Sequence, residues 1–358
     1  MKSVAKIGFQ LSDANVHAVT GYCAAEMAIE KANQTMGLPF EIKLELVNDL
    51  HEPEGARKAA YEFIKDPEAV AIFGSLNSAL CYSSQDIYAE AGLPQLTSEA
   101  SSPMLTNRGF KNFFRLVASD EIQGRRLAQA AVKYLGAKRI AVMHDDSTWG
   151  RPIAEIFSQE AESLGAKPVC FWGFRDGIEK DLNFDEMVDA IVASEPDLVY
   201  YAVYWNKAHI ITHRLRDRGV KAIFLGSDAL KPFPFLEVPS LDTTPPYHSL
   251  AGVDIRIKPS ARAFFEEFSQ KWPTLMVAPQ YSAEAYDIGC ITCECLRRAG
   301  KPDRAALLHE LQNLGSFEGA IGHIEFEENG DIKNPPVGLY QCKDGLRNFI
   351  GNISDLIK

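Results

Sequence analysis

The chain has 358 residues, of which 46% are apolar, so it is long enough for two domains of ordinary size. Its 37 lysines and arginines against 48 aspartates and glutamates give a net charge of −11 at pH 7, which disfavours broad binding to nucleic acid or an anionic membrane. Charged residues at 24% and aromatic residues at 10% exclude disordered, collagen-like and coiled-coil chains. No apolar run approaches the ~20 residues that cross a bilayer.

Short β-branched or aromatic runs alternate with longer helical patterns, which is typical of βαβ units and a mainly parallel sheet. In the first part of the chain we predict strands at residues 4–9, 42–47, 70–73, 94–96 and 113–116. The helices between them are predicted at residues 18–33, 53–65 and 78–91. This pattern describes one doubly wound unit of a little more than a hundred residues.

The same pattern begins again after Ser119. Its predicted strands are residues 139–143, 167–171, 198–203, 222–225 and 249–252. Its predicted helices are residues 122–135, 151–164, 183–194 and 207–218. From Lys258 onward the sequence predicts two helices and a hairpin. The repetition indicates two doubly wound lobes of similar build rather than one large sheet.

The seven cysteines are an odd number in a chain too long to need a disulfide framework. Three of them form the cluster Cys290-x-x-Cys293-x-Cys295 within a predicted helix, with no second ligand pair at zinc-site spacing. We therefore predict that they are buried small side chains. The amino terminus shows no apolar stretch with a small-residue cleavage site, but a chain written from a mature amino terminus looks the same, so the compartment stays open.

Polar residues gather after the predicted strands of both lobes, where open parallel sheets bind their ligands. These segments are Gln10 to Asp13, Asn48-Asp49, Gly74 to Ser78, Thr97 to Ser102, His144 to Trp149, Tyr204 to Asn206 and Ser227-Asp228. Two such rims that face each other across a hinge make a cleft that closes around a small solute. The sequence lacks nucleotide-binding glycine motifs, a nucleophile elbow and H-E-x-x-H, and their absence argues against an enzyme.

Several of these polar residues suit a small zwitterion. Ser78 is predicted to cap a helix, where a hydroxyl and unpaired N–H groups bind a carboxylate, and Ser101-Ser102-Pro103 repeats the pattern with serine as the cap and proline at the first helical position. Asp228 is an acid that can pair with a ligand ammonium. Trp149 and Tyr204 can pack against an apolar side chain of the ligand. The alternative is that the serines only cap helices, the acid is solvated and the aromatic residues fill a surface.

The sequence resembles the leucine/isoleucine/valine-binding protein family, the type I periplasmic solute receptors of ABC importers. The resemblance runs from Ile7 to about Tyr340. Its clearest segments are Phe73 to Ser78, Ser101 to Thr106, Phe114-Arg115-Leu116, Ser119-Asp120-x-x-Gln123-Gly124, Ile140 to Asp145 with Trp149-Gly150, Pro196 to Tyr201, and Gly319 to Asp331. It implies an α/β fold of two Rossmann-like, doubly wound lobes joined by a three-stranded hinge, the Venus-flytrap arrangement. Lobe 1 would hold residues 1–119 and 252–329, and lobe 2 residues 120–251 and 330–358.

The resemblance also implies roles for the site residues. Ser78 matches a position that binds the ligand carboxylate, and Ser101 one that contacts both carboxylate and ammonium. Asp228 matches the acid that neutralises the ammonium, and Glu99 falls where a backbone carbonyl binds it. Trp149, Tyr204 and His17 fall at positions that are usually aromatic, and Asn77 precedes Ser78. The expected ligand-binding residues are Ser78, Glu99, Ser101, Trp149, Tyr204, Asp228, His17 and Asn77.

The chain departs from the family pattern at several positions. A family disulfide would join the loops that here contain His51 and Asn77, so that bridge is absent. A small residue is usual at Glu99: an inward Glu99 would favour a cationic or amine-rich ligand, and an outward one would change nothing. His17 replaces a larger aromatic residue, and Asp13 stands where a turn glycine is common.

The function implied is a non-catalytic substrate-binding protein of an ABC importer. It would capture a small amino acid, branched-chain or related, and deliver it to a membrane permease. We expect a monomer without cofactor, metal or nucleic-acid partner, periplasmic after removal of a signal peptide and cytoplasmic if the gene encodes none. Two alternatives stay open: a cytosolic ligand sensor of the same fold that controls a regulator, and a receptor for a non-amino-acid carboxylate or amide.

Overall fold

The computed structural model describes residues 3–11, 16–147, 149–174, 184–230, 245–252, 256–275, 281–343 and 346–358. The chain divides into two units. Unit 1 comprises Met1–Ala118 and Gly252–Pro335, and unit 2 comprises Ser119–Ala251 and Pro336–Lys358. The chain therefore passes from one unit to the other after Ala118, Ala251 and Pro335.

Unit 1 begins with alternating strands and helices. In chain order these are β1 (Ser3–Gln10), α1 (Val16–Thr35), β2 (Phe40–Val47), α2 (Pro53–Phe63), β3 (Ala69–Phe73), α3 (Ser78–Glu90), β4 (Gln95–Thr97), α4 (Met104–Asn107) and β5 (Phe113–Arg115). Its second stretch adds η5 (Pro259–Ala261), α9 (Arg262–Lys271), α10 (Ser282–Ala299), α11 (Arg304–Gln312) and the hairpin of β11 (Phe317–Gly319) and β12 (Gly322–Ile324).

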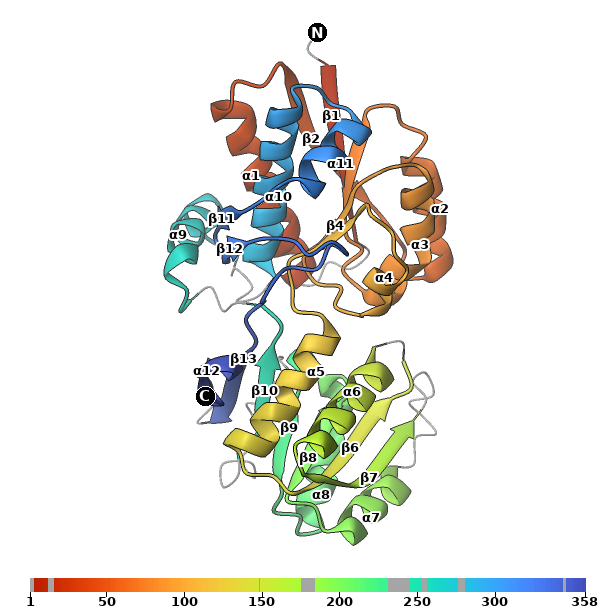
Figure 1. Ribbon diagram of the computed structural model, residues 1–358, viewed down its shortest axis with the longest axis vertical. Helices are drawn as coiled ribbons and strands as arrows, with labels where there is room; N and C mark the ends of the chain where they lie inside the picture. Colours follow the sequence, from red (N-terminus) through yellow and green to blue (C-terminus); the bar gives the residue numbers. More distant parts are fainter. Residues whose placement is uncertain are drawn as a thin grey trace. The chain divides into compact units, whose positions relative to one another are not determined.

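The sheet of unit 1 has the order β2-β1-β3-β4-β5, and all of its neighbouring strands are parallel. Helices α2 and α3 pack together on one face, and α1 and α10 pack together on the other (Figure 1). The strand order reverses between β1 and β3, which is the place where doubly wound sheets of this order bind ligands. Parallel strands with helices on both faces confirm the predicted α/β fold class.

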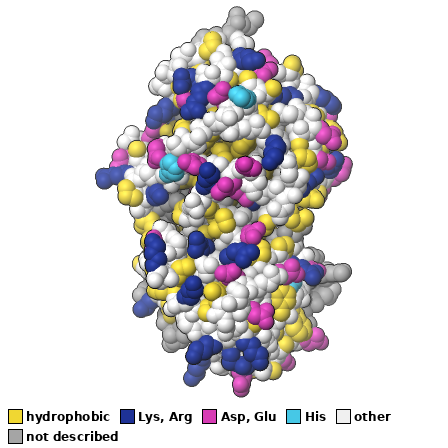
Figure 2. All heavy atoms as spheres, in the orientation of Figure 1, with side chains coloured by type: hydrophobic (Ala, Val, Ile, Leu, Met, Phe, Trp, Pro, Cys, Tyr) yellow, Lys and Arg dark blue, Asp and Glu magenta, His cyan; other side chains and the backbone are white. Residues whose placement is uncertain are grey.

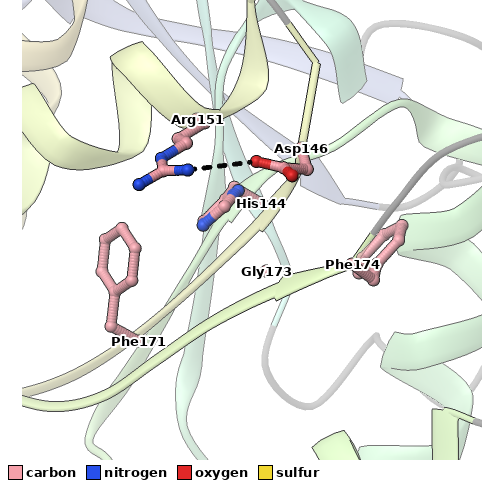
Figure 3. A pocket seen from close by; sticks show the side chains of 6 residues that line it. All are labelled: His144, Asp146, Arg151, Phe171, Gly173 and Phe174. Carbon is pink, nitrogen blue, oxygen red and sulfur yellow. Dashed lines mark hydrogen bonds and ion pairs between the residues drawn. The ribbon is translucent and has the colours of Figure 1, made fainter.

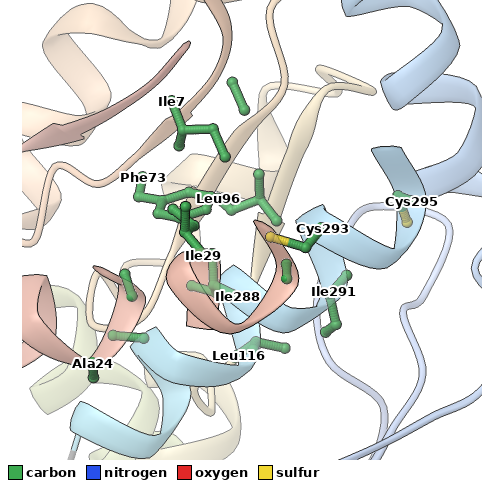
Figure 4. Packing of buried hydrophobic residues seen from close by; sticks show 14 of the residues in the cluster. Ile7, Ala24, Ile29, Phe73, Leu96, Leu116, Ile288, Ile291, Cys293 and Cys295 are labelled. Atoms are coloured by element: carbon green, nitrogen blue, oxygen red, sulfur yellow. The ribbon is translucent and has the colours of Figure 1, made fainter. Parts of the chain in front are cut away.

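The larger core of unit 1 lies between the sheet and the pair α1 and α10 (Figure 4). Ile7 and Phe73 from the sheet meet Ile29 from α1 and Ile288 from α10. Cys293 and Cys295 are fully buried in the same cluster, so the prediction of buried small side chains is confirmed for both, whereas Cys290 is half-buried. All seven cysteines are free thiols.

Unit 2 repeats the alternation. Its elements are α5 (Asp120–Gln129), which continues as the π-helical turn η1 (Ala130–Tyr134), β6 (Arg139–Asp145), α6 (Gly150–Ser163), β7 (Lys167–Phe174), α7 (Phe184–Ser194), β8 (Leu198–Ala202), α8 (Trp205–Asp217), β9 (Ile223–Gly226), η2 (Asp228–Leu230), β10 (Tyr247–Leu250), β13 (Gly338–Lys343), β14 (Leu346–Asn352) and α12 (Ile353–Leu356).

The sheet of unit 2 has the order β14-β13-β10-β9-β8-β6-β7. Strands β6 to β10 are parallel and repeat the strand order of unit 1, and β13 and β14 add an antiparallel edge. Helices α7 and α8 cover one face of this sheet, where Met143, Tyr201 and Phe224 form the core. On the opposite face, Tyr200 stacks on Phe157 of α6 with ring centroids 3.8 Å apart.

The sequence predicted too few helices and hairpins for the end of the chain. The described residues after Lys258 contain three helices longer than one turn, α9, α10 and α11, and two hairpins, β11–β12 and β13–β14. Gly300 ends α10 in the left-handed conformation, and Asp303 caps α11, so these two helices are separate elements. Strands β13 and β14 pair with each other and extend the edge of the unit 2 sheet beside β10.

The described surface mixes both signs of charge. On the face shown in Figure 2, Lys and Arg side chains alternate with Asp and Glu side chains, without a broad area of one sign among the described residues. Among these residues no helix is both long and apolar enough to cross a bilayer.

Candidate functional site

The predicted site residues of unit 1 follow strands that are neighbours in its sheet. Ser78 follows β3 and Ser101 follows β4, and these two parallel strands pair directly. His17 follows β1, which pairs with β3 on the other side, but the side chain of His17 lies outside the described part of the structure. Because parallel strands end at one edge, these loops gather there.

The start of α3 corrects one prediction. The residue that caps α3 is Asn77, whose side-chain oxygen accepts hydrogen bonds from the backbone N–H groups of Ala79 at 2.8 Å and Leu80 at 3.4 Å. Ser78 is the first helical residue and is half-buried. Asn and Ser are both good caps, so the sequence alone placed the cap one residue too late.

The second predicted cap is also wrong. Helix α4 begins at Met104, with Pro103 rather than serine in the capping position and without a side-chain hydrogen bond at the cap. The preceding turn is instead organised by Thr97, whose hydroxyl oxygen accepts from the N–H groups of half-buried Glu99 at 3.3 Å and Ala100 at 3.1 Å. Ser101 therefore lies in a turn held by side chains and not at a helix start.

The two serine segments of unit 1 contact each other. The Ser102 N–H donates to the Ser78 hydroxyl oxygen at 3.2 Å, which joins the turn after β4 to the first residue of α3. Ser101 is 6% exposed, and its hydroxyl has no hydrogen-bond partner among the residues that the structure describes. The Ser78 and Ser101 segments thus form one polar cluster at the sheet edge, with hydroxyl groups that suit an anionic oxygen.

Behind this cluster lies Arg115, which was not among the predicted site residues. Arg115, on β5, is fully buried and donates to the backbone oxygen of Ser102 at 2.9 Å. The sequence does contain an indication of this role: Arg115 lies between Phe114 and Leu116 in a predicted buried strand, and a buried arginine needs partners for its hydrogen-bond donors.

The predicted residues of unit 2 follow three consecutive strands of its sheet. Trp149 follows β6, Tyr204 follows β8 and Asp228 follows β9, and β8 pairs in parallel with both of the others. Trp149 is 9% exposed and Tyr204 is 40% exposed, and their ring centroids are 5.2 Å apart with planes inclined by 38°. These two aromatic side chains are therefore brought together at the strand-order switch of unit 2.

The loop before Trp149 is fixed by a buried acid. Asp145 accepts a short hydrogen bond from the Ser147 hydroxyl, whose oxygen in turn accepts from the N–H groups of Trp149 at 3.3 Å and Gly150 at 2.8 Å. Burial raises the pKa of Asp145 above its ordinary value. This chain of hydrogen bonds sets where α6 begins and so where Trp149 lies.

Asp228 opens the short helix η2 and is 9% exposed. The carboxylate of Asp228 affects a buried side chain of unit 2. Burial raises the pKa of the fully buried Tyr200, and the negative charges of Asp120 and Asp228 raise that pKa further. A low-exposure carboxylate at a strand end has the chemistry to bind an ammonium group.

A pocket of about 360 Å³ lies elsewhere in unit 2, beside the edge strand β7 (Figure 3). It is lined by His144, Asp146, Arg151, Phe171, Gly173 and Phe174. The His144 Nδ1 donates to the backbone oxygen of Asp145 at 2.9 Å, and Arg151 pairs with Asp146 at 3.5 Å. None of the predicted site residues lines this pocket.

Nothing in the described residues groups three or more His, Cys, Asp or Glu side chains as a metal site would. His209 and His213 lie on α8 with their Nε2 atoms 3.3 Å apart, but this pair has no third ligand among the described residues.

The chain is similar to binding proteins over nearly its whole length. The periplasmic binding protein family model matches residues 15–346. The Leu/Ile/Val-binding protein homolog 3 of Brucella melitensis is 25% identical over 323 residues, which cover 90% of this chain and 86% of that protein. The amino acid binding protein of Pseudomonas aeruginosa is 28% identical over 333 residues, which cover 89% of this chain and 84% of that protein.

The fold is similar to that of a solved receptor. A leucine binding protein from Thermotoga maritima superposes with a TM-score of 0.85 at 24% identity, covering 98% of this chain and 99% of that chain. The resemblance stated from the sequence and the type I periplasmic binding protein fold are thereby confirmed. Because the family model spans most of its residues, this protein belongs to the periplasmic binding protein family.

Proposed function

We propose that this protein is the substrate-binding protein of an ABC importer for a small aliphatic L-amino acid, with branched-chain amino acids as the first candidates. The observation that carries the proposal is the contact between Ser102 and Ser78, which gathers two hydroxyl-bearing segments at the ligand edge of the unit 1 sheet. The named specificities of the relatives from Brucella melitensis and Pseudomonas aeruginosa support an amino acid as the solute.

In this proposal unit 1 binds the carboxylate. The Asn77 side chain already occupies the N–H groups of Ala79 and Leu80. The ligand oxygens would therefore rely on the hydroxyls of Ser78 and Ser101, aided by the positive end of the 13-residue helix α3.

Unit 2 would supply the remaining contacts to the same amino acid. Asp228 would neutralise the ammonium group, and Trp149 with Tyr204 would contact the aliphatic side chain. Glu99 decides between two ligand classes, because an acidic side chain turned toward the ligand would favour a second cationic group. Asn77 and His17 complete the proposed set, Asn77 by capping α3.

Closure of two lobes on the ligand would be the functional step, with the ligand binding the closed state more tightly than the open one. The two units, Met1–Ala118 with Gly252–Pro335 and Ser119–Ala251 with Pro336–Lys358, are proposed to be these lobes. The protein would act as a monomer in the periplasm, present its solute to a membrane permease and carry out no catalysis.

A thermal-shift panel tests this proposal. L-leucine, L-isoleucine, L-valine, L-arginine and benzoate are added separately to the protein, and a ligand at a hundredfold excess over its Kd stabilises by about 2.7 kcal/mol. We expect a shift with at least one aliphatic amino acid. A larger shift with L-arginine would assign Glu99 to the site, and a shift with benzoate alone would favour a receptor for non-amino-acid carboxylates.

Asp228→Asn is the variant that probes the ammonium contact, because it keeps the side-chain shape and removes the charge. It is expected to abolish the shift while leaving the melting temperature without ligand close to that of the wild type. The matched control is Glu162→Gln, which removes an exposed acid from α6 of the same unit and should keep the full shift. An unchanged shift in Asp228→Asn would overturn the proposed role.

A further inference from the structure

Arg115 is a buried cation, and each of its three side-chain nitrogen atoms donates to an acceptor in unit 1. Its side chain is fully buried, the most voluminous to be so among the described residues. The Nε atom donates to Asp331 Oδ1 at 2.5 Å, and Nη2 donates to the Thr106 hydroxyl at 3.0 Å. Burying a guanidinium is costly unless its charge and its hydrogen-bond donors are matched, so this arrangement is specific.

The third nitrogen of Arg115 holds the turn that carries Ser101. Nη1 donates to the backbone oxygen of Ser102 at 2.9 Å and lies 3.5 Å from the backbone oxygen of Ala100. These two carbonyls belong to the residues on either side of Ser101. One guanidinium group therefore contacts the carbonyl oxygens of both residues that flank Ser101.

The hydrogen bonds continue from this turn to α3. The N–H of Ser102 donates to the Ser78 hydroxyl, while the carbonyl of the same residue accepts from Arg115. Ser102 thus connects Arg115 to both Ser78 and Ser101, the two residues proposed to bind the carboxylate. A shift of the Arg115 guanidinium would move the Ser101 peptide groups and the donor that orients Ser78.

Arg115 is itself held by the segment that precedes the last passage to unit 2. The N–H of Arg115 donates to the Gly330 oxygen at 3.0 Å, and Arg115 forms a parallel bridge with Asp331. Gly330 has φ of +87°, and a Cβ there would lie 1.8 Å from the Phe113 oxygen, so this segment packs directly on β5. The side chain of Asn329 donates to Asp331 Oδ2 at 3.0 Å and completes the anchor.

We propose that Arg115 is a positioning residue for ligand binding. Anchored by Asp331 and Thr106, it holds the Ala100–Ser102 turn in the conformation in which Ser78 and Ser101 bind a carboxylate. The inference rests on the proposed function for the identity of the ligand group, whereas the ordering of the turn by Arg115 can be measured without any ligand. Lysine cannot replace arginine here, because a single ammonium cannot reach acceptors that lie on several sides of a planar fork.

The test compares four variants with the wild type. Arg115→Lys keeps the charge and removes the fork. Thr106→Val removes one acceptor with little change of volume, and Thr106→Ser restores the hydroxyl. The control is Arg304→Lys: Arg304 donates to the backbone oxygens of Ile64, Asp66 and Ala69 at the start of β3, the opposite end from Ser78.

Two measurements are made on each variant. The first is hydrogen exchange of the peptide that contains residues 99–103 in the protein without ligand, read by mass spectrometry. The second is the Kd for L-leucine by calorimetry. For Arg115→Lys we expect amide exchange in this peptide to be about tenfold faster and the Kd about tenfold weaker, the effect of losing one good hydrogen bond.

Thr106→Val is expected to change both quantities in the same direction, and Thr106→Ser to restore them. Arg304→Lys should leave both unchanged even where it lowers the melting temperature. Equal exchange and equal Kd in folded Arg115→Lys and wild type would overturn the inference. If Arg115→Lys does not fold, unchanged exchange in Thr106→Val would overturn it. If the wild type binds none of L-leucine, L-isoleucine and L-valine, the proposed function loses its support, and hydrogen exchange alone decides the role of Arg115.

Discussion

Arg115 and Asp331 form an ion pair in which a fully buried guanidinium meets a carboxylate that is 17% exposed, with Nε and Oδ1 2.5 Å apart. The two residues are 216 positions apart in the sequence, and they join β5 to the segment that leads out of unit 1 at Pro335. The pair therefore ties the two stretches of chain that make unit 1.

Removing the carboxylate of this pair is predicted to destabilise the protein strongly. Asp331→Ala leaves a buried cation without its counter-charge, and the free energy of unfolding should fall by about 3 kcal/mol, the lower end for a broken buried pair because Asp331 is partly exposed. Urea unfolding followed by circular dichroism measures the change. The control Glu62→Ala breaks an exposed pair with Lys65 and should leave the stability near that of the wild type. Equal free energies of unfolding for the two variants would show that the buried pair contributes no more to stability than the exposed pair does.

Two neighbouring tyrosines of β8 offer a matched comparison. Both are fully buried, but the Tyr201 hydroxyl accepts from the Thr212 hydroxyl at 2.9 Å, whereas the Tyr200 hydroxyl has no hydrogen-bond partner among the described residues. Tyr201→Phe should lower the free energy of unfolding by about 1 kcal/mol, and Tyr200→Phe should leave it unchanged or raise it. Chemical unfolding of both variants checks the order, and the reverse order would contradict it.

Asp287 is predicted to make stability depend on pH. It is fully buried and accepts hydrogen bonds from the N–H groups of Ala320 and Ile321, both at 2.8 Å, at the tip of the β11–β12 hairpin. Burial raises its pKa from 3.8 to about 7. Between these values the folded state holds the proton more tightly than the unfolded state does, so the stability that Asp287 contributes falls as pH rises from about 4 to 7.

Asp287→Asn isolates this effect, because the two proteins differ in this one ionisable side chain. The variant loses one acceptor and should be less stable than the wild type at pH 5. The difference should shrink toward pH 8 by no more than about 1.4 kcal/mol per pH unit. Urea midpoints at four pH values measure it, and a difference independent of pH would show that Asp287 keeps an ordinary pKa.

Gly173 is predicted to be required for the packing of His144. A Cβ at Gly173 would lie 2.4 Å from the His144 ring, so Gly173→Ala must displace the ring and should cost about 1–3 kcal/mol. In α1, a Cβ at Gly21 would meet Phe9 at 3.5 Å, an ordinary contact, so Gly21→Ala should raise stability by about 0.5–1 kcal/mol. Thermal unfolding of both variants is the measurement. A harmless Gly173→Ala would mean that the ring relocates freely.

The alternation of strands and helices could be predicted from the sequence, because each element carries its own periodicity. The run at residues 70–73, for example, is the fully buried strand β3, Ala69–Phe73. The placement of caps was less secure. Asn77 and Ser78 are adjacent and both cap helices well, so the choice depends on where the chain enters α3 and not on residue type.

The support of the site could not be predicted, because it depends on contacts between distant parts of the chain. Nothing near Arg115 in the sequence indicates that Asp331 will be its partner. Likewise, Pro103 suggested a regular helix start, yet the Ser101 turn is set by Thr97 at the end of β4 and by Arg115 from the next strand. Local patterns predicted which residues reach the sheet edge, and the fold decided how they are held.

We propose that this protein binds an aliphatic amino acid through Ser78, Ser101 and Asp228. Calorimetric titration of L-leucine, L-isoleucine and L-valine into protein that has been unfolded, dialysed and refolded to remove any bound solute tests this binding. We predict saturable binding of at least one of them with one site per chain, and loss of that binding in Asp228→Asn. No heat from any of the three with folded wild-type protein, or undiminished binding in Asp228→Asn, would contradict the claim.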